Sequence, residues 1–370
     1  MQQRVIISQD IEHDLAQAIA ETENDRVFVL TDDITQECCL PKVAVLFAKH
    51  NATTITIRHD DTNKTLATLA DVWTALQRGG ATRHSLLVNL GGGMVTDLGG
   101  FAAATFKRGI NFINIPTTLL AMVDAAVGGK TGINFGGLKN EVGAFANARY
   151  VIVNTCFLDT LDTANLCSGY AEMLKHSLIS NAQMWAEHVN FDILQPDLAE
   201  LQRMVAASIA VKEHIVADDP HEHGIRKALN FGHTIGHALE EFSMQQPGGA
   251  VVSARLLPLA KARTAPKNTL LHGYAVAFGL IGELYISARK AGFPTARLHQ
   301  TARFIRENYG AVAFTCDDYP TLLNLMRHDK KNTSDTINFT LLHDIGDIRI
   351  NQTATDEEIR EALDFIREGY

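Results

Sequence analysis

Four apolar runs that alternate with helical stretches constrain the fold of this chain more than any other feature. They lie in the first 150 residues and read RVFVL (Arg26–Leu30), TTITI (Thr53–Ile57), SLLVNL (Ser85–Leu90) and FINIP (Phe112–Pro116). Strands that alternate with helices, such as the helix expected over Leu66–Gln77, form a parallel sheet with helices on both faces. From about Leu161 onward the pattern becomes mostly helical. We therefore expect an α/β domain with a Rossmann-like parallel sheet over residues 1–160 and a mostly α-helical domain over residues 161–370.

The charge and the cysteines of the chain argue against several classes of protein. The net charge is −9, which disfavours binding to a nucleic-acid backbone. No stretch approaches the roughly 18 apolar residues of a membrane span, and the N-terminus lacks the apolar segment of a signal peptide. The five cysteines form no CxxC pair, which is typical of free thiols in a reducing compartment. We expect a cytoplasmic protein with neither a nucleic-acid nor a membrane partner.

A glycine-rich turn follows the third apolar run. In LLVNLGGGMVTDLGG, Gly91, Gly92 and Gly93 come directly after the expected strand. Glycines at such a turn let the backbone approach a pyrophosphate, whose charge the following helix N-terminus favours. The usual GxGxxG spacing is absent because Thr96 stands where the third glycine would be. By itself the turn fits an ordinary strand-to-helix connection equally well.

A second stretch, IPTTLLAMVDAAVGGKTGIN, concentrates polar groups between apolar runs. Thr117 and Thr118 follow a strand end, where open α/β sheets bind their ligands. Asp124, Lys130 and the Lys139–Asn140 pair come soon after. Lysines beside glycines often contact phosphate or carboxylate groups. The alternative is a loop whose lysines are simply solvated.

A third stretch, LNFGHTIGHALE, carries a polar stripe on one helix face. With Arg226 included, the stripe joins Arg226, Asn230, His233 and His237 at helical spacing. A helix face of this composition, next to an apolar face, is more typical of binding to an anion or a metal than of exposure to solvent.

Two further motifs add candidate metal ligands. GYAEMLKHSLI places Glu172, Lys175 and His176 on one helix face, and LLHGYAV carries His272. A catalytic zinc takes three protein ligands and keeps one position open. The residues alone do not choose the three among Glu172, His233, His272 and the alternatives His176 and His237.

These motifs, in this order, resemble the 3-dehydroquinate synthase family of the sugar phosphate cyclase superfamily. The resemblance runs from TDD near Thr31 to DKKN near Asp329 and rests on GGGxxxD, RG, PTTLLAxVDAAVGGKTGIN, KN, GxAExxKH, RxxLNFGHTIGHA, LLHG and DKK. It implies that the α/β domain binds a nucleotide and that the helical domain binds metal and substrate, with the site in the cleft between them. It also implies NAD, one divalent metal (zinc, with cobalt as the alternative), a small anionic sugar-phosphate substrate and a homodimer.

The resemblance also assigns roles to individual residues. The metal ligands would be Glu172, His233 and His272, with His237 in the substrate pocket. Catalytic roles would fall to Lys130, Lys175, Asn230 and His237, and further substrate contacts to Arg108, Asp124, Asn140, Arg226 and one of Lys330 and Lys331. NAD would contact Asp61, Lys64, Gly91, Gly92, Gly93, Asp97, Thr117, Thr118, Lys139 and Thr160.

The implied reaction converts 3-deoxy-D-arabino-heptulosonate 7-phosphate to 3-dehydroquinate and phosphate, a step of aromatic amino acid biosynthesis. It proceeds by transient oxidation, phosphate elimination, re-reduction and aldol closure. One alternative is a related cyclase that acts on sedoheptulose 7-phosphate, and another is a non-catalytic homologue that only binds ligands. A metal-dependent polyol dehydrogenase shares the architecture but not the lysine-rich pocket.

The chain departs from the family pattern in three places. Tyr274 stands where LLHGEAV has Glu, and Asp60-Asp61-Thr62-Asn63-Lys64 replaces a GExxK motif. Extra residues also separate His237 from His272. We expect this segment, Met244–Asn268, to be a mobile surface excursion, because loop-closure entropy grows only slowly with length. Its apolar middle, Ala250–Ala260, would otherwise pack as a short helix or strand.

Overall fold

The computed structural model describes residues 3–245, 251–252, 269–328 and 336–369. They form two compact units, which are described separately below. The first comprises Met1–Leu161 with Asp197–Ile209, and the second comprises Asp162–Pro196 with Ala210–Tyr370. The first unit thus takes in a stretch from the half of the chain that the sequence assigned to the helical domain. The roles expected of the two domains remain predictions.

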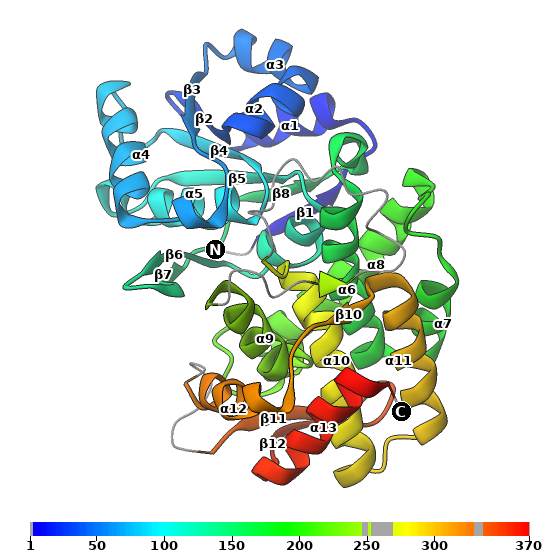
Figure 1. Ribbon diagram of the computed structural model, residues 1–370. Coiled ribbons are helices and arrows are strands. Elements are labelled where there is room, and N and C mark those ends of the chain that lie inside the picture. Colours follow the sequence, from blue (N-terminus) through cyan, green and yellow to red (C-terminus); the bar gives the residue numbers. More distant parts are fainter. Residues whose placement is uncertain (1–2, 246–250, 253–268, 329–335, 370) are drawn as a thin grey trace. The chain divides into compact units, whose positions relative to one another are not determined.

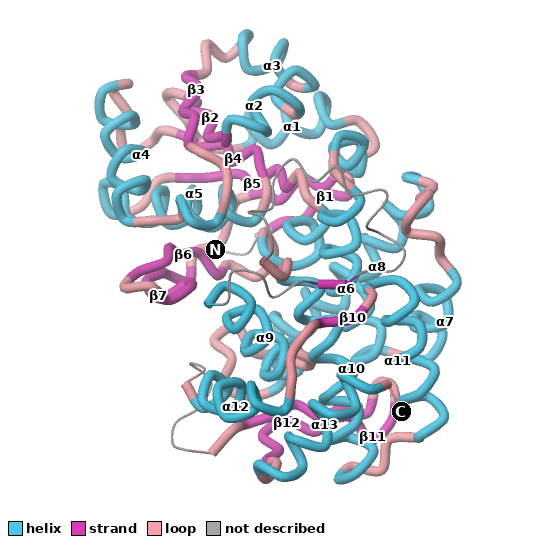
Figure 2. The backbone as a smooth tube through the Cα atoms, viewed as in Figure 1, coloured by secondary structure: helices cyan, strands magenta, loops and turns pink. Residues whose placement is uncertain are grey.

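A six-stranded sheet forms the centre of the first unit, in the order β1-β8-β5-β4-β2-β3 (Figures 1 and 2). All five strand pairs are parallel. The strands are β1 (Arg4–Ile7), β2 (Val27–Asp32), β3 (Thr53–Ile57), β4 (Leu86–Gly91), β5 (Asn111–Pro116) and β8 (Tyr150–Val153). The predicted Rossmann-like α/β class is confirmed, and the four predicted strands correspond to β2, β3, β4 and β5.

Helices flank this sheet because its central strands are apolar on both faces. Every residue of β2 and β4 is buried. The helices are α1 (Ile11–Glu21), α2 (Asp33–Cys38), α3 (Ala44–Lys49), α4 (Leu66–Arg78) and α5 (Gly93–Thr105), with short turns η1 (Leu40–Lys42), η2 (Asp61–Asn63), η3 (Phe106–Arg108), η4 (Ala121–Ala125) and η5 (Thr155–Thr160). The helix α5 packs on β4 and β5, and its own Leu98, Ala102 and Ala103 are fully buried.

An antiparallel hairpin, β6 (Lys130–Phe135) and β7 (Leu138–Phe145), projects from the same unit. Phe135 pairs with Leu138, so Gly136 and Gly137 alone form the connection. Both glycines have positive φ, +61° and +84°, as a two-residue type I′ turn requires. We predicted no strands here, because the lysines and glycines of this stretch indicated contacts with phosphate or carboxylate groups.

The second unit is built mainly from helices, which confirms the predicted helix-rich C-terminal region. They are α6 (Thr163–Ser180), α7 (Ala182–Asn190), η6 (Ile225–Asn230), α9 (His233–Gln245), α10 (His272–Lys290), α11 (Thr295–Tyr309), η7 (Cys316–Asp318), α12 (Tyr319–Arg327) and α13 (Asp356–Glu368), while α8 (Leu198–Asp218) begins in the first unit. The helix α10 is central, because it packs against α6, α9, α11 and α13. Two antiparallel pairs accompany the helices: β11 (Asn338–Asp344) with β12 (Asp347–Thr353), and β9 (Val251–Val252) with β10 (Ala311–Val312).

Two points complete the fold. Among the described residues, no helix combines the length and the apolarity needed to cross a membrane. Of the extra segment Met244–Asn268, the structure describes the end of α9 and the strand β9, and the remainder lies outside the described residues. The expectation that this segment is mobile therefore stays a prediction.

Candidate active site

Glycines bring α6, α9 and α10 close together in the second unit. A Cβ on Gly273 would lie 1.8 Å from the carbonyl oxygen of Ser168, so only glycine fits where α10 crosses α6. The Gly273 amide also donates to Ser168 Oγ at 3.0 Å. A Cβ on Gly279 would likewise lie 1.9 Å from the carbonyl oxygen of Gly232, just before α9. These close crossings allow polar side chains of the three helices to meet.

The start of α9 is held by a buried carboxylate on α10. Glu283 accepts from the amide of Gly232 at 2.7 Å and from the amide of Thr234 at 2.9 Å. The first amides of a helix have no partner within the helix, so this carboxylate satisfies them and offsets their positive dipole. His233, the first residue of α9, is thereby fixed relative to α10.

Glu172, His233 and His272 converge at this crossing, one from each helix. The Oε1 atom of Glu172 lies 3.3 Å from Nε2 of His233 and 3.3 Å from Nε2 of His272. The Glu172 carboxylate is fully buried, its Oε2 forms an ion pair with the ammonium of Lys175, and its Oε1 faces the two imidazole rings. A buried carboxylate is costly unless nearby cationic groups compensate its charge.

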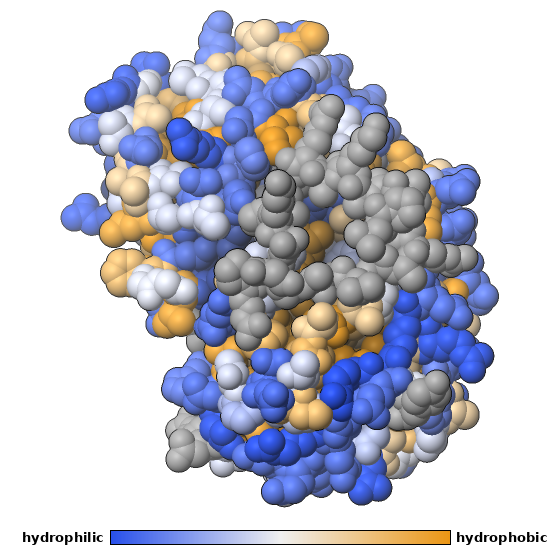
Figure 3. Space-filling model, viewed as in Figure 1, coloured by the Kyte–Doolittle hydropathy of each residue, from blue (hydrophilic) through white to orange (hydrophobic). Residues whose placement is uncertain are grey.

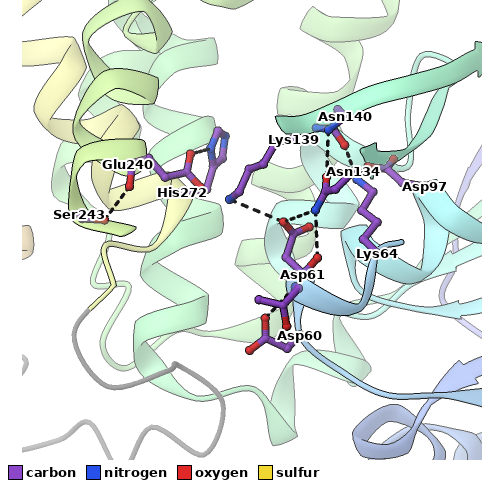
Figure 4. Close-up of polar contacts among 11 residues, drawn as sticks. Asp60, Asp61, Lys64, Asp97, Asn134, Lys139, Asn140, Glu240, Ser243 and His272 are labelled. Carbon is purple, nitrogen blue, oxygen red and sulfur yellow. Dashed lines mark hydrogen bonds and ion pairs between the residues drawn. The ribbon is translucent and has the colours of Figure 1, made fainter. Parts of the chain in front are cut away.

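The far nitrogen of each imidazole has its own partner. Nδ1 of His233 lies 3.2 Å from the carbonyl oxygen of Phe231, and Nδ1 of His272 lies 2.9 Å from Oε2 of Glu240 (Figure 4). If a metal ion took the place of the Nε2 protons, Nδ1 of each ring would still donate to its partner, and both Nε2 lone pairs would be available to the ion. Metal-binding histidines commonly have this arrangement.

Charges inside the cluster perturb two pKa values. Burial would raise the pKa of Glu172, but the ammonium of Lys175 and the ring of His233 hold it well below its usual range. Burial would lower the pKa of His272, but the carboxylates of Glu240 and Glu172 outweigh it and raise the pKa to about 10. The lowered pKa keeps Glu172 ionised beside its cationic neighbours, and the raised pKa of His272 reflects the two carboxylates that face its ring.

A tetrahedral divalent ion fits this donor set. Ligand atoms about 2.0–2.1 Å from a tetrahedral zinc lie about 3.3–3.4 Å apart. Both separations from Glu172 Oε1 to an imidazole Nε2, at 3.3 Å, match that spacing. One carboxylate oxygen and two imidazole nitrogens also form the kind of three-ligand set used by catalytic zinc, which leaves a position for substrate.

His237 and His176 also lie near the three proposed metal ligands, Glu172, His233 and His272. The rings of His233, His237 and His272 form a triangle with centroid distances of 5.2, 5.4 and 5.8 Å. Their ligand nitrogens lie within 4.8 Å of one another, so three histidines form a second candidate donor set. His176 is fully buried on α6, four residues after Glu172. The structure therefore keeps His237 as a rival ligand, and the assignment of Glu172, His233 and His272 remains a prediction.

Three expected substrate residues, Lys175, Arg226 and Asn230, lie in the same unit as the three proposed metal ligands. Lys175, nearly fully buried, forms an ion pair with Oε2 of Glu172. Arg226 is also buried, and one of its guanidinium nitrogens donates to the carbonyl oxygen of Pro220 at 2.5 Å. Asn230 donates from Nδ2 to Oε1 of Glu222 at 2.5 Å. The turn η6 thus presents an arginine and an amide close to the start of α9.

In the first unit, the expected nucleotide-binding residues gather where β4 and β5 end. Gly91 ends β4, Gly92 precedes α5, and Gly93 begins it. The amide of Thr117, directly after β5, donates to the carbonyl oxygen of Gly91 at 3.0 Å. A Cβ on Gly92 would lie 3.0 Å from the methyl carbon of Thr118. The two motifs that looked separate in sequence therefore form one surface at the carboxyl edge of the sheet.

A polar network joins more of the expected NAD residues in this unit (Figure 4). Lys64 Nζ lies 2.5 Å from Oδ2 of Asp97 and also donates to Oδ1 of Asn140. Burial raises the pKa of Asp97, and the Lys64 ammonium opposes that shift. Lys139 lies 3.7 Å from a carboxylate oxygen of Asp61. Asn140, expected to contact substrate, thus contacts an expected NAD residue.

The remaining expected residues of the first unit lie on turns, apart from Lys130 at the start of β6. Lys107 and Arg108 have left-handed φ of +50° and +69°, a conformation that costs a non-glycine residue about 1–3 kcal/mol and is common at functional sites. Asp124 is half-buried in η4, and Lys130 is exposed at the start of β6. Thr160 ends η5, where its hydroxyl donates to the carbonyl oxygen of Phe157 at 3.5 Å. Lys330 and Lys331 lie outside the described residues.

Sequence reasoning missed three polar partners in these clusters. Glu240 contacts His272, Glu222 contacts Asn230, and Asn134 donates to Oδ2 of Asp61 at 3.0 Å. For Glu240 a signal was present, since it follows His233 by two helical turns and His237 by three residues on the same face. Glu222 and Asn134 lie on turns and strands whose contacts no helical spacing indicates.

Comparisons with known proteins bear on the whole chain. The family model described as 3-dehydroquinate synthase N-terminal matches residues 54–168, and the corresponding C-terminal model matches residues 169–257 and 260–332. A curated 3-dehydroquinate synthase from Parabacteroides distasonis is 50% identical over 369 residues, which cover 100% of this chain and 99% of that protein.

Two solved structures are similar in fold. A 2-deoxy-scyllo-inosose synthase complexed with carbaglucose-6-phosphate, NAD+ and Co2+ has a TM-score of 0.81 at 22% identity, covering 100% of this chain and 96% of that one. A 2-epi-5-epi-valiolone synthase from Streptomyces hygroscopicus, with NAD+ and Zn2+ bound, has a TM-score of 0.81 at 24% identity, covering 100% and 98%. At these identities the two structures establish a shared fold alone.

Proposed function

The chain belongs to the 3-dehydroquinate synthase family, and from that premise we propose that it converts 3-deoxy-D-arabino-heptulosonate 7-phosphate to 3-dehydroquinate and phosphate. The reaction would run by transient oxidation, phosphate elimination, re-reduction and aldol closure. In class the enzyme would be a carbon–oxygen lyase that acts on a phosphate ester, in aromatic amino acid biosynthesis.

The cluster of Glu172, His233 and His272 carries this proposal. An enzyme that only bound a sugar phosphate would not need a buried carboxylate 3.3 Å from two imidazole nitrogens. We assign these three residues as the ligands of one divalent ion, zinc or cobalt. We assign His237 to the substrate pocket beside them.

The cationic and amide side chains would bind and orient the substrate. Lys175 and Arg226 are buried, so their charges are poorly screened by water and bind an anionic group strongly. Asn230, tied to Glu222, presents an amide of fixed orientation to a hydroxyl. The remaining substrate contacts would come from Lys130, Arg108, Asp124, Asn140 and one of Lys330 and Lys331. A phosphate held in a fixed orientation leaves more readily as the neighbouring proton is removed.

The nucleotide would bind in the first unit. The turn Gly91–Gly93 offers backbone amides at the N-terminus of α5 to a pyrophosphate. The rest of NAD would be bound by Asp61, Lys64, Asp97, Thr117, Thr118, Lys139 and Thr160. When bound, NAD would supply reversible hydride transfer. The divalent ion would supply a Lewis acid for the oxygen on the substrate carbon that is oxidised.

An assay with two substrates tests the proposal. Purified protein, catalytic NAD and zinc are incubated separately with the heptulosonate phosphate and with sedoheptulose 7-phosphate, and phosphate release is measured. We expect rapid release from the heptulosonate alone. Faster release from sedoheptulose 7-phosphate would assign the chain to a different cyclase activity, and stoichiometric metal binding without release from either would indicate a non-catalytic homologue.

We further propose that the enzyme is a homodimer. The hairpin β6–β7 exposes four large apolar side chains: Phe135 (53% exposed), Leu138 (49%), Val142 (38%) and Phe145 (55%). Figure 3 shows apolar surface at the left edge of the molecule, where Figure 1 places this hairpin. Exposed apolar patches of this kind mark protein interfaces. Light scattering should give a dimer that Phe135→Asp with Phe145→Asp converts to monomer, and a wild-type monomer would refute the proposal.

We place the enzyme in the cytoplasm. All five cysteines are free thiols, and two of them, Cys38 and Cys39, are adjacent. Unpaired thiols are typical of a reducing compartment. Fractionation of cells that produce the enzyme should recover it with cytosolic markers, and recovery with exported proteins would contradict this placement.

A further inference from the structure

Glu240 lies behind the cluster rather than in it. Its Oε2 atom is 2.9 Å from Nδ1 of His272, the ring nitrogen that faces away from Glu172 (Figure 4). The Glu240 side chain is only 6% exposed. A buried carboxylate is costly unless it is paired, so its ion pair with His272 is a built feature rather than an incidental surface contact.

A serine ties Glu240 to the segment that leads into His272. The hydroxyl of Ser243 donates to the backbone oxygen of Glu240 at 2.7 Å and accepts from the amide of Leu270 at 3.1 Å. Leu270 lies two residues before His272. The last turns of α9 therefore hold both the start of α10 and the imidazole ring that α10 presents.

The two histidines of the cluster differ in their outer partners. Nδ1 of His233 faces a backbone carbonyl oxygen, which is neutral, whereas Nδ1 of His272 faces a carboxylate. A carboxylate fixes the ring orientation as a carbonyl does, and its charge also makes the opposite nitrogen a stronger donor to a cation. The carboxylate of Glu240 provides this second effect to His272.

We propose that Glu240 is a positioning residue that orients His272 and strengthens it as a metal ligand. The helix α9 would thus supply one ligand, His233, and also the residue that controls a second ligand on α10. The inference rests on the proposed metal site, and it adds a residue that touches neither metal nor substrate.

Cobalt binding to the metal-free enzyme provides the test, because cobalt reports both affinity and ligand geometry through its visible absorption. The variants are Glu240→Ala and Glu240→Gln, and the second keeps an oxygen acceptor while removing the charge. Glu241→Ala and Glu241→Gln are the matched controls, since Glu241 is the next residue of α9 and is exposed. His233→Ala is the reference for loss of a ligand.

We expect Glu240→Ala to bind cobalt about 10–100-fold more weakly than wild type and to show an altered visible spectrum at saturation. Glu240→Gln should fall between wild type and Glu240→Ala, and both Glu241 variants should stay within twofold of wild type. If Glu240→Ala does not fold, Glu240→Gln decides: affinity within twofold of wild type and an unchanged spectrum overturn the proposal, and a larger loss supports it.

Failure of the metal site itself would look different. In that case wild type would bind no cobalt, or His233→Ala would bind it as tightly as wild type. A different result would refute only the role of Glu240. In that case wild type would bind cobalt, His233→Ala would not, and the Glu240 variants would bind it with wild-type affinity and spectrum.

Discussion

Oε1 of Glu172 lies 3.3 Å from Nε2 of His272, although the two residues come from different helices far apart in the chain. The approach depends on Gly273, because any side chain there would collide with the backbone of α6 at Ser168. The same oxygen lies equally far from Nε2 of His233. The proposed metal site therefore depends on the crossings of α10 with α6 and with α9, and not on a continuous sequence motif.

Alanine variants should separate the proposed ligands from their neighbours. We expect His233→Ala and His272→Ala to lose most bound zinc, because a three-ligand site rarely holds its ion with two. His237→Ala should keep it, since the proposed site takes its two imidazole nitrogens from His233 and His272, each 3.3 Å from Oε1 of Glu172. Metal analysis by mass spectrometry checks this, and zinc lost from His237→Ala but kept by His272→Ala would favour the three-histidine set.

Lys130→Ala should impair substrate handling and leave NAD binding unchanged. Loss of a charge-assisted hydrogen bond costs about 1.5–3 kcal/mol, so kcat/KM for the heptulosonate phosphate should fall roughly 10- to 150-fold. Lys49→Ala is the control, because Lys49 is an exposed lysine on α3. Steady-state kinetics with NAD titration measure the change, and equal activity in both variants would remove Lys130 from the pocket.

Gly273→Ala should destabilise the protein and loosen the metal site together. The added methyl would meet the carbonyl oxygen of Ser168 at 1.8 Å, and overpacking of this kind costs about 1–3 kcal/mol. Gly224→Ala is the matched control, since its Cβ would meet only a side-chain oxygen of Asp219, at 3.7 Å. Calorimetry and metal analysis should show a lower Tm and less zinc in Gly273→Ala alone, and a wild-type Tm would show that the helices can separate freely.

His188 should make the fold less stable in mild acid. It is buried on α7, its Nδ1 lies 2.7 Å from the carbonyl oxygen of Met184, and burial lowers its pKa from 6.5. As pH falls below the unfolded pKa, the unfolded chain takes up a proton that the folded chain resists, so stability drops until the folded pKa is passed.

A buried-to-exposed comparison of histidines tests this pH effect. Between about pH 7.5 and about pH 5.5, the Tm of His188→Gln should fall less than that of wild type. The Tm of His214→Gln should fall as much as that of wild type, because the His214 side chain is 80% exposed. If His188→Gln and wild type lose the same Tm, proton uptake at His188 does not contribute.

Periodicity allowed the main elements to be predicted where local pattern and burial agree. The strand expected at Thr53–Ile57 has the same bounds in the structure, and the helix expected at Leu66–Gln77 ends one residue later. The hairpin β6–β7 was missed because the lysines and glycines around its turn, Gly136–Gly137, indicated contacts with phosphate or carboxylate groups and not strands. Short edge strands such as β1 carry too few residues for an alternation to be visible.

The candidate site was predictable in its residues but not in its contacts. The polar stripe of His233 and His237 identified α9, yet only packing shows that Nε2 of His233 faces Glu172. Asn140 was expected at the substrate, whereas its amide oxygen accepts from Lys64. Glu240 went unnoticed because a glutamate on a helix is usually solvated, although its spacing from His233 and His237 placed it on their face of α9.

The turnover of NAD tests the central proposal most directly. The metal-loaded enzyme is given one equivalent of NAD and a hundredfold excess of 3-deoxy-D-arabino-heptulosonate 7-phosphate, and phosphate, 3-dehydroquinate and absorbance at the NADH band are followed together. Because the hydride is returned in every cycle, we expect phosphate and 3-dehydroquinate to reach nearly the full substrate concentration with no net NADH. Two results would contradict the account: phosphate release that stops at one equivalent per NAD while an equal amount of NADH accumulates, or no phosphate release at all.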